Sequence, residues 1–130
     1  MDSARLTPDS DLLTRDIIGA ALDVHRFLGP GLLESTYEVC LAHELGLRGH
    51  VIERQVAVPL RYKGIDLEVG YRMDIVVEGS VLVEVKAVEK LHPVTTAQVL
   101  TYLRLSGLRA GLICNFHVEL LKEGIRRVSR

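Results

Sequence analysis

Apolar residues at helical spacing predict two helices in the first third of the chain. The first helix is expected to begin at residues 7–9, because a threonine cap, a first-turn proline and a following acid favour a helix start. Residues 29–31, Gly-Pro-Gly, end this helix, and a second is expected from about Leu32 to Leu47. The apolar face of the first helix is predicted to hold Leu13, Ile17, Ala20, Val24 and Phe27.

After residue 50 apolar and polar positions alternate, which is the pattern of β-strands. A hairpin turn is expected at residues 62–64, Tyr-Lys-Gly, and a second turn at residues 79–80. Helical spacing returns between Pro93 and Gly107. The predicted strands cover residues 51–60, 67–77, 81–88 and 110–116, with residues 125–128 as a candidate edge strand.

This order of elements predicts an α/β fold, in which helices cover the faces of a mixed sheet. The chain has 130 residues, of which 48% are apolar, so it is long enough for one hydrophobic core and too apolar to be disordered over most of its length. We therefore expect a single domain over residues 1–130, with residues 1–6 frayed.

Composition also narrows the choice of partners and location. The net charge is −1, so no overall positive field attracts nucleic acid, and any such contact needs a local basic patch. Cys40 and Cys114 stand far apart in apolar surroundings, as buried thiols do. No apolar run is long enough to cross a membrane, and the N-terminus lacks a signal-peptide pattern, which together predict a cytoplasmic protein. The basic residues at the C-terminal end, a solvated tail or a local patch, are Lys122, Arg126, Arg127 and Arg130.

The strand at residues 81–88 carries an acid and a base on one face. Side chains alternate across a strand, so Glu84 and Lys86 point away from the valines at 81, 83 and 85. In the preceding strand the same alternation places Asp74 opposite Met73, Ile75 and Val77. If these strands are hairpin neighbours, Asp74 and Glu84 converge.

Two convergent carboxylates suit a hard divalent cation such as Mg²⁺. A lysine beside them could orient an attacking water or stabilise charge on a phosphate. The alternative is a surface ion pair between Glu84 and Lys86, which would stabilise the fold little.

Two helices add polar candidates. Glu34 lies on or beside the buried stripe that includes Tyr37, where it needs a partner or serves as an early-turn acid favoured by the helix dipole. Gln98 and Tyr102 lie one turn apart in the third helix and could contact a base or sugar, or could simply form its exposed edge.

These residues resemble the motifs of a known protein family. Residues 31–37, Gly-Leu-Leu-Glu-Ser-Thr-Tyr, match the motif that names the GxxExxY protein family, and the chain resembles that family over about residues 10–118. The family is placed in the PD-(D/E)XK nuclease-like superfamily. Its further landmarks occur here in the same order: Gln55, residues 62–64, 71–74, 84–86, 97–98, 102–103 and 115–116.

The resemblance implies a restriction-endonuclease-like core with the order ααβββαβ. It implies that Asp74 and Glu84 bind the metal, Mg²⁺ or Mn²⁺, and that Lys86 is the catalytic lysine. Glu34 would be an additional catalytic acid at the metal. Met73 stands where the superfamily motif has its dispensable proline.

The resemblance also implies substrate contacts. Gln98 and Tyr102 resemble the Q-x-x-x-Y motif of exonuclease-type branches, and Gln55 and Tyr37 are further substrate-binding candidates. The leading hypothesis is thus a metal-dependent nuclease acting on DNA, with a homodimer expected by analogy. The alternatives are a non-catalytic module that binds nucleic acid or protein, and a homo-oligomer in which the polar cluster is a buried network. The chain lacks zinc-ligand spacing, a phosphate-binding loop and a nucleophile elbow.

Overall fold

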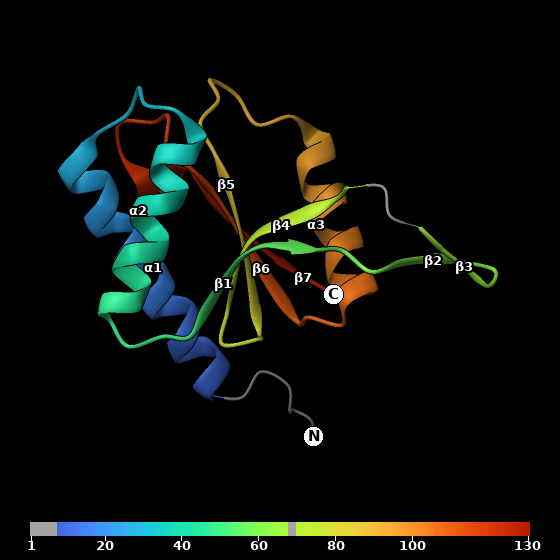
Figure 1. Ribbon diagram of the computed structural model, residues 1–130. Coiled ribbons are helices and arrows are strands. Elements are labelled where there is room, and N and C mark those ends of the chain that lie inside the picture. The colour runs from blue at the N-terminus through green and yellow to red at the C-terminus, as the bar shows by residue number, and fades with distance from the viewer. Residues whose placement is uncertain (1–7, 68–69) are drawn as a thin grey trace.

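A computed structural model describes residues 8–67 and 70–130 of the chain (Figure 1). Residues 1–6 and the expected cap at Thr7 lie outside this part. No helix within it is long and apolar enough to span a membrane. The elements are α1 (Pro8–Leu28), α2 (Glu34–Leu47), β1 (Ile52–Ala57), β2 (Leu60–Tyr62), β3 (Ile65–Leu67), β4 (Arg72–Val77), β5 (Val81–Lys86), α3 (Pro93–Ser106), β6 (Ala110–Asn115), the 3₁₀ turn η1 (Leu121–Glu123) and β7 (Ile125–Ser129).

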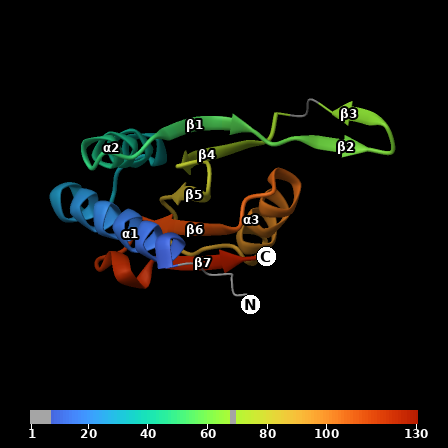
Figure 2. The same cartoon turned by 90° about the horizontal axis from the view of Figure 1, so that it is seen from below.

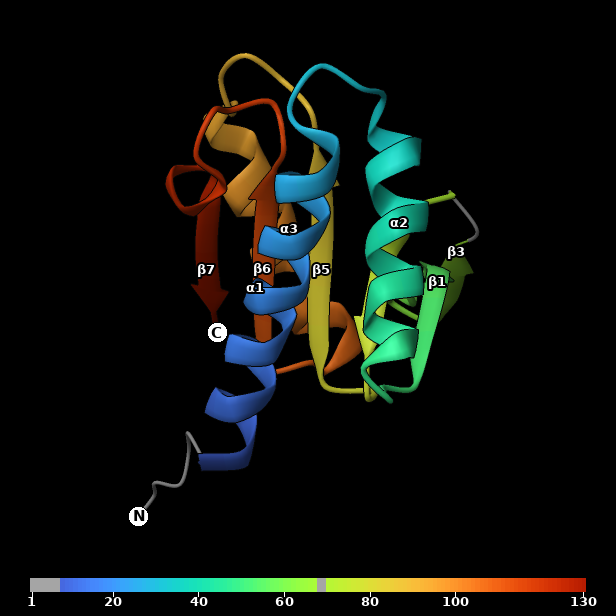
Figure 3. The same cartoon turned by 90° about the vertical axis from the view of Figure 1, so that its left-hand side faces the viewer.

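The predicted mixed α/β fold is confirmed. Five strands form one sheet in the order β1-β4-β5-β6-β7, and β5 pairs antiparallel with β4 but parallel with β6. Helix α3 connects the two parallel strands. Figure 2 shows the strands edge-on, with α1 and α2 on one face of the sheet and α3 on the other, and Figure 3 shows α1 and α2 lying across the near face. The candidate edge strand becomes β7.

Each face of the sheet has its own apolar core. Val81, Val83 and Val85 of β5 pack in the cluster that includes α1 and α2, whereas Leu82 packs in the cluster with Val99 of α3. The alternation predicted for β5 is therefore confirmed, and it leaves Glu84 and Lys86 on the α3 face.

The apolar stripe of α1 departs from the predicted pattern in the last turn of the helix. Ile17, Ala20 and Val24 are buried, but the prediction for Phe27 is wrong, because its side chain is 89% exposed. Leu28 packs against the core in its place. Residues 24 and 28 are four apart, so the buried face of the last turn follows this spacing rather than the spacing of three that leads to Phe27.

The predicted strands at 51–60 and 67–77 are each interrupted. Their adjoining ends form a separate two-stranded hairpin, β2 and β3, which extends beyond the sheet (Figures 1 and 2). The predicted turn at residues 62–64 is confirmed, since Lys63 and Gly64 both have positive φ, at 45° and 90°, as a tight hairpin turn requires.

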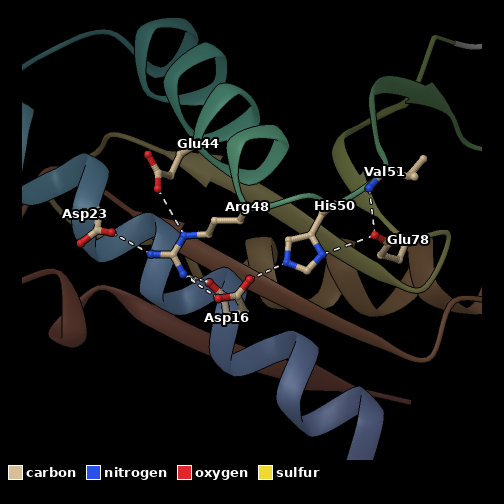
Figure 4. Close-up of polar contacts among 7 residues, drawn as sticks. All are labelled: Asp16, Asp23, Glu44, Arg48, His50, Val51 and Glu78. Atoms are coloured by element: carbon tan, nitrogen blue, oxygen red, sulfur yellow. Dashed lines mark hydrogen bonds and ion pairs between the residues drawn. The ribbon is translucent and has the colours of Figure 1, made fainter.

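A charged network joins α1 to the end of α2 (Figure 4). The Arg48 guanidinium donates to Asp16, Asp23 and Glu44 at 2.6, 2.7 and 3.2 Å. His50 continues the network from Asp16 to Glu78. This network lies at the opposite end of β4 from Asp74, so it positions the helices and stays remote from the candidate site.

Candidate metal and active site

The sheet opens at Asp74. In the β4–β5 ladder the paired residues run from Val77 and Val81 to Ile75 and Val83. The next pair in this register would be Asp74 with Glu84, but no ladder pair forms there. In the β1–β4 ladder the pair opposite Asp74 would be Gln55, and it is also missing. Asp74 therefore lies where β4 loses its regular pairing on both sides.

Side chains replace the missing backbone bonds at this opening. The Asp74 amide donates to Oε2 of Glu84 at 2.9 Å. The Val85 amide donates to Oδ2 of Asp74, also at 2.9 Å. Each carboxylate is thus held by a main-chain group of the neighbouring strand, and the two acids lie on adjacent strands of one hairpin.

The opening also changes which face one residue occupies. Met73 was predicted to share a face with Ile75 and Val77, and this prediction is wrong. Met73 packs on the α3 side with Val76 and Leu82, whereas Ile75 and Val77 pack towards α1 and α2. Simple alternation fails because the β1–β4 ladder lacks the Gln55–Asp74 pair and resumes at Val56 and Met73. An irregularity of this kind shifts the alternation of faces by one residue.

The charge of Asp74 disfavours ionisation of Glu84. Burial, followed by the charge of Asp74, raises the pKa of Glu84 to about 7, and only 4% of the Glu84 side chain is exposed. Burial also raises the pKa of Asp74, against the opposing effect of the Val85 amide. A site that resists two negative charges is one that an added cation stabilises.

Lys86 supplies positive charge at this site. It follows Glu84 on the same face of β5, and its charge lowers the pKa of both Asp74 and Glu84. Its carbonyl accepts from the Phe116 amide at 2.8 Å. Asn115 fixes the chain just after β5, since its side chain forms hydrogen bonds with both the amide and the carbonyl of Val88. The strand end that carries Lys86 is therefore held in place from β6.

Glu38 is a second buried acid that the sequence patterns did not single out. It is 7% exposed and accepts hydrogen bonds from Gln55 at 2.9 and 3.1 Å and from Arg54 at 3.0 and 3.2 Å. Gln55 adopts a positive φ of 53° and also reaches Oδ1 of Asp74 at 3.5 Å. The charge of Glu38 raises the pKa of both Asp74 and Glu84. Its spacing of three, four and seven residues from Leu41, Ala42 and Leu45, which are also buried, was the available signal in the sequence.

The structure places Glu34 and Tyr37 to the side of this cluster. Glu34 is exposed and accepts from the Ala87 amide at 3.2 Å, just beyond Lys86. Tyr37 is fully buried and stacks on Phe116, with 4.6 Å between ring centroids. Its hydroxyl donates to the Gly29 carbonyl at 2.5 Å and accepts from the Leu32 amide at 3.1 Å. These contacts join the turn before α2 to the core.

Helix α3 brings Tyr102 towards the acids. Burial, followed by the charge of Glu84, raises the pKa of Tyr102, and its ring lies 6.2 Å from that of Tyr71. Gln98 lies one helical turn before it and is half-buried. Gln55 and Tyr102 therefore approach the acid pair from opposite sides of the opening.

The residues present fit a hard divalent cation in charge and chemistry. Across residues 8–67 and 70–130 no group of three or more histidine, cysteine, aspartate or glutamate side chains is arranged to hold a metal. The cluster instead offers two convergent carboxylates, with Glu38 joined to Asp74 through Gln55. Oxygen donors of this kind are those that Mg²⁺ and Mn²⁺ prefer.

Comparison with known proteins agrees with this geometry. A model of the PD-(D/E)XK nuclease superfamily matches residues 11–128. Searches of curated proteins and of solved structures gave no match. The family match covers nearly all of the chain, and the chain belongs to the PD-(D/E)XK nuclease superfamily.

Proposed function

We propose that this protein is a nuclease that uses Mg²⁺ or Mn²⁺ to hydrolyse phosphodiester bonds in nucleic acid, with DNA as the expected substrate. The observation that carries the proposal is the locked pair of Asp74 and Glu84, with Lys86 on the same strand face. Within the superfamily, the motif at residues 31–37 supports assignment to the GxxExxY family.

Asp74 and Glu84 would hold the metal. The bound ion would supply a Lewis acid that polarises the phosphate and lowers the pKa of water. Glu38 adds negative charge next to this pair, and we assign it, in place of Glu34, as the third acid of the site. Lys86 would orient water and stabilise negative charge on the phosphate.

The remaining candidates divide by their contacts. Tyr102 and Gln55 lie near the acid pair, and Gln98 lies one helical turn before Tyr102. All three would contact the substrate. Glu34 and Tyr37 would act through the backbone, by fixing the end of β5 and the turn before α2. A single domain over residues 1–130, a cytoplasmic location and a homodimer remain predictions.

The test is cleavage of end-labelled single-stranded and duplex DNA with Mg²⁺ or Mn²⁺. We expect the wild type to cleave, and Glu84→Gln and Lys86→Ala to lose about a hundredfold or more of the rate. Arg15→Ala is the matched control, because Arg15 is an exposed cation on α1. If both site variants keep full activity while folded, the assigned mechanism is wrong.

A second candidate function is a non-catalytic module that binds nucleic acid or protein. It is favoured by the lack of a three-ligand metal cluster in the part of the chain that the structure describes. Binding of DNA by the wild type, with no cleavage under either metal, would support this candidate over the nuclease.

A further inference from the structure

We propose that the β2–β3 hairpin and the end of α3 form a track for single-stranded nucleic acid that leads to Asp74 and Glu84. This inference deepens the proposed function, since it names the form of the substrate, and it rests on that function for its purpose.

The hairpin has one apolar face and one charged face. Cross-strand partners lie on the same face of a ribbon, and Leu60 pairs with Leu67 while Tyr62 pairs with Ile65. Arg61 and Asp66 pair on the other face. Tyr62 is 60% exposed and Ile65 is 58% exposed. An exposed apolar face of this kind is typical of an interaction surface.

A groove connects this apolar face to α3. Leu60 and Leu67 line it together with Arg104 and Leu105 at the end of the helix. Leu105 lies three residues after Tyr102, so both lie on one side of α3. Figure 2 shows the hairpin extending on the side of the sheet that α3 covers, which is also the side that Glu84 and Lys86 face.

Tyrosines mark the path from the hairpin to the acids. The protein has four tyrosines, and only Tyr37 lies in the core of the opposite face. Tyr62 lies on the hairpin, and Tyr71 is exposed at its base, with its ring 6.2 Å from that of Tyr102. Tyr102 packs in the cluster that includes Met73, the residue before Asp74, which places this tyrosine at the inner end of the path.

Charge and shape favour a single strand over a duplex. The apolar side chains are bordered by Arg61, Lys63 and Arg104, cations that suit phosphates, although the net charge of the chain is −1. Arg61 and Asp66 form an exposed pair at 3.4 Å, which a phosphate can replace at little cost. A single strand presents unpaired base faces to aromatic and apolar side chains, whereas a duplex hides them.

The test measures binding without cleavage. Fluorescence anisotropy of labelled oligothymidylate, with wild-type protein in EDTA, is compared for Tyr62→Ala, Tyr71→Ala and Lys63→Ala. We expect each tyrosine variant to bind at least about fivefold more weakly, and the lysine variant to show a smaller dependence of affinity on salt. Phe27→Ala is the matched control, because Phe27 is an exposed aromatic residue on α1, and its affinity should be unchanged.

Four results would overturn the track. These are no binding by the wild type, unchanged binding in Tyr62→Ala, an equal loss in Phe27→Ala, or equally tight binding of a blunt duplex. Light scattering gives a further check: if Tyr62→Ala converts a dimer into a monomer and leaves DNA binding unchanged, the hairpin is an interface between copies. Circular dichroism confirms that each variant is folded. Binding is measured without metal and cleavage is measured with it. A wild type that binds in EDTA but never cleaves with Mg²⁺ or Mn²⁺ therefore contradicts the proposed nuclease and leaves the track intact.

Discussion

The Asp74 amide donates to Oε2 of Glu84 at 2.9 Å, so a side chain occupies the place of a backbone rung between β4 and β5. The reciprocal bond from the Val85 amide to Asp74 fixes the second acid in the same way. Both carboxylates therefore take their positions from the sheet and not from flexible rotamers. Such preorganisation is what a site that binds a cation and a phosphate needs.

The raised pKa of Glu84 predicts a stability that depends on pH. Between the ordinary value of 4.5 and about 7, the folded state binds more protons at Glu84 than the unfolded state does. In the absence of divalent metal, this contribution to stability is complete below pH 4.5 and is lost as the pH rises through 7. The complete loss lowers the free energy of unfolding by on the order of 3 kcal/mol.

The measurement is urea unfolding of the wild type and Glu84→Gln in EDTA, near pH 5 and near pH 8. We expect the stability of Glu84→Gln relative to the wild type to increase with pH. Glu53→Gln changes an exposed acid of β1 and serves as the control. An identical dependence on pH in the wild type and Glu84→Gln would contradict the assigned burial of charge.

Glu38→Gln should lower the pKa of Glu84, because it removes a negative charge that disfavours ionisation there. The measurement is an NMR titration of the Glu84 side-chain carboxyl carbon. Glu34→Gln is the control, since the contact of Glu34 is the Ala87 amide, and it should leave the titration unchanged. A larger shift in Glu34→Gln than in Glu38→Gln would restore Glu34 as the third acid.

Tyr37→Phe should reduce the free energy of unfolding by about 1–3 kcal/mol, because the Leu32 amide and the Gly29 carbonyl lose their shared partner. The ring stays stacked on Phe116, so the site itself should be unaffected. Chemical unfolding measures the stability of the variant. Its DNA-binding affinity tests whether Tyr37 contacts the substrate. A variant with wild-type stability and weakened DNA binding would show that Tyr37 contacts the substrate.

Arg48→Met should lower the free energy of unfolding more above pH 4 than below it. Hydrogen bonds from His50 and Arg48 lower the pKa of Asp16, and those from Arg48 and Arg26 lower the pKa of Asp23. Stability from these ionised acids is present above their ordinary value of 3.8 and is lost as the pH falls through the lowered values. Acid unfolding followed by circular dichroism tests this. Arg126→Met is the control, because Arg126 is exposed and bonds to backbone carbonyls, and a loss that is equal at every pH would contradict the role of Arg48.

The helices and most strands were predictable because apolar spacing records which face of an element is buried. Pro93 and Gly107 bounded α3 correctly, and the alternation in β5 placed Glu84 and Lys86 together. The convergence of Asp74 with Glu84 followed from hairpin pairing alone. These features depend on local periodicity, which a single sequence contains.

Features that depend on tertiary contacts were not predictable. Helical spacing indicates that Glu38 faces the core, but only its contacts with Arg54 and Gln55 show that it lies next to Asp74. Met73 changes face because the ladder between β1 and β4 is interrupted at the next residue, Asp74. The hairpin strands have only three residues each, too few to show a period.

The central claim is that Asp74 and Glu84 bind a divalent cation, and the most direct test is Mn²⁺ binding followed by electron paramagnetic resonance near pH 8. We predict that the wild type binds Mn²⁺, that Mg²⁺ competes, and that Asp74→Asn binds at least about tenfold more weakly. Asp66→Asn, an exposed acid of the hairpin, should bind as the wild type does. Equal Mn²⁺ affinity in the wild type and a folded Asp74→Asn protein would contradict the claim.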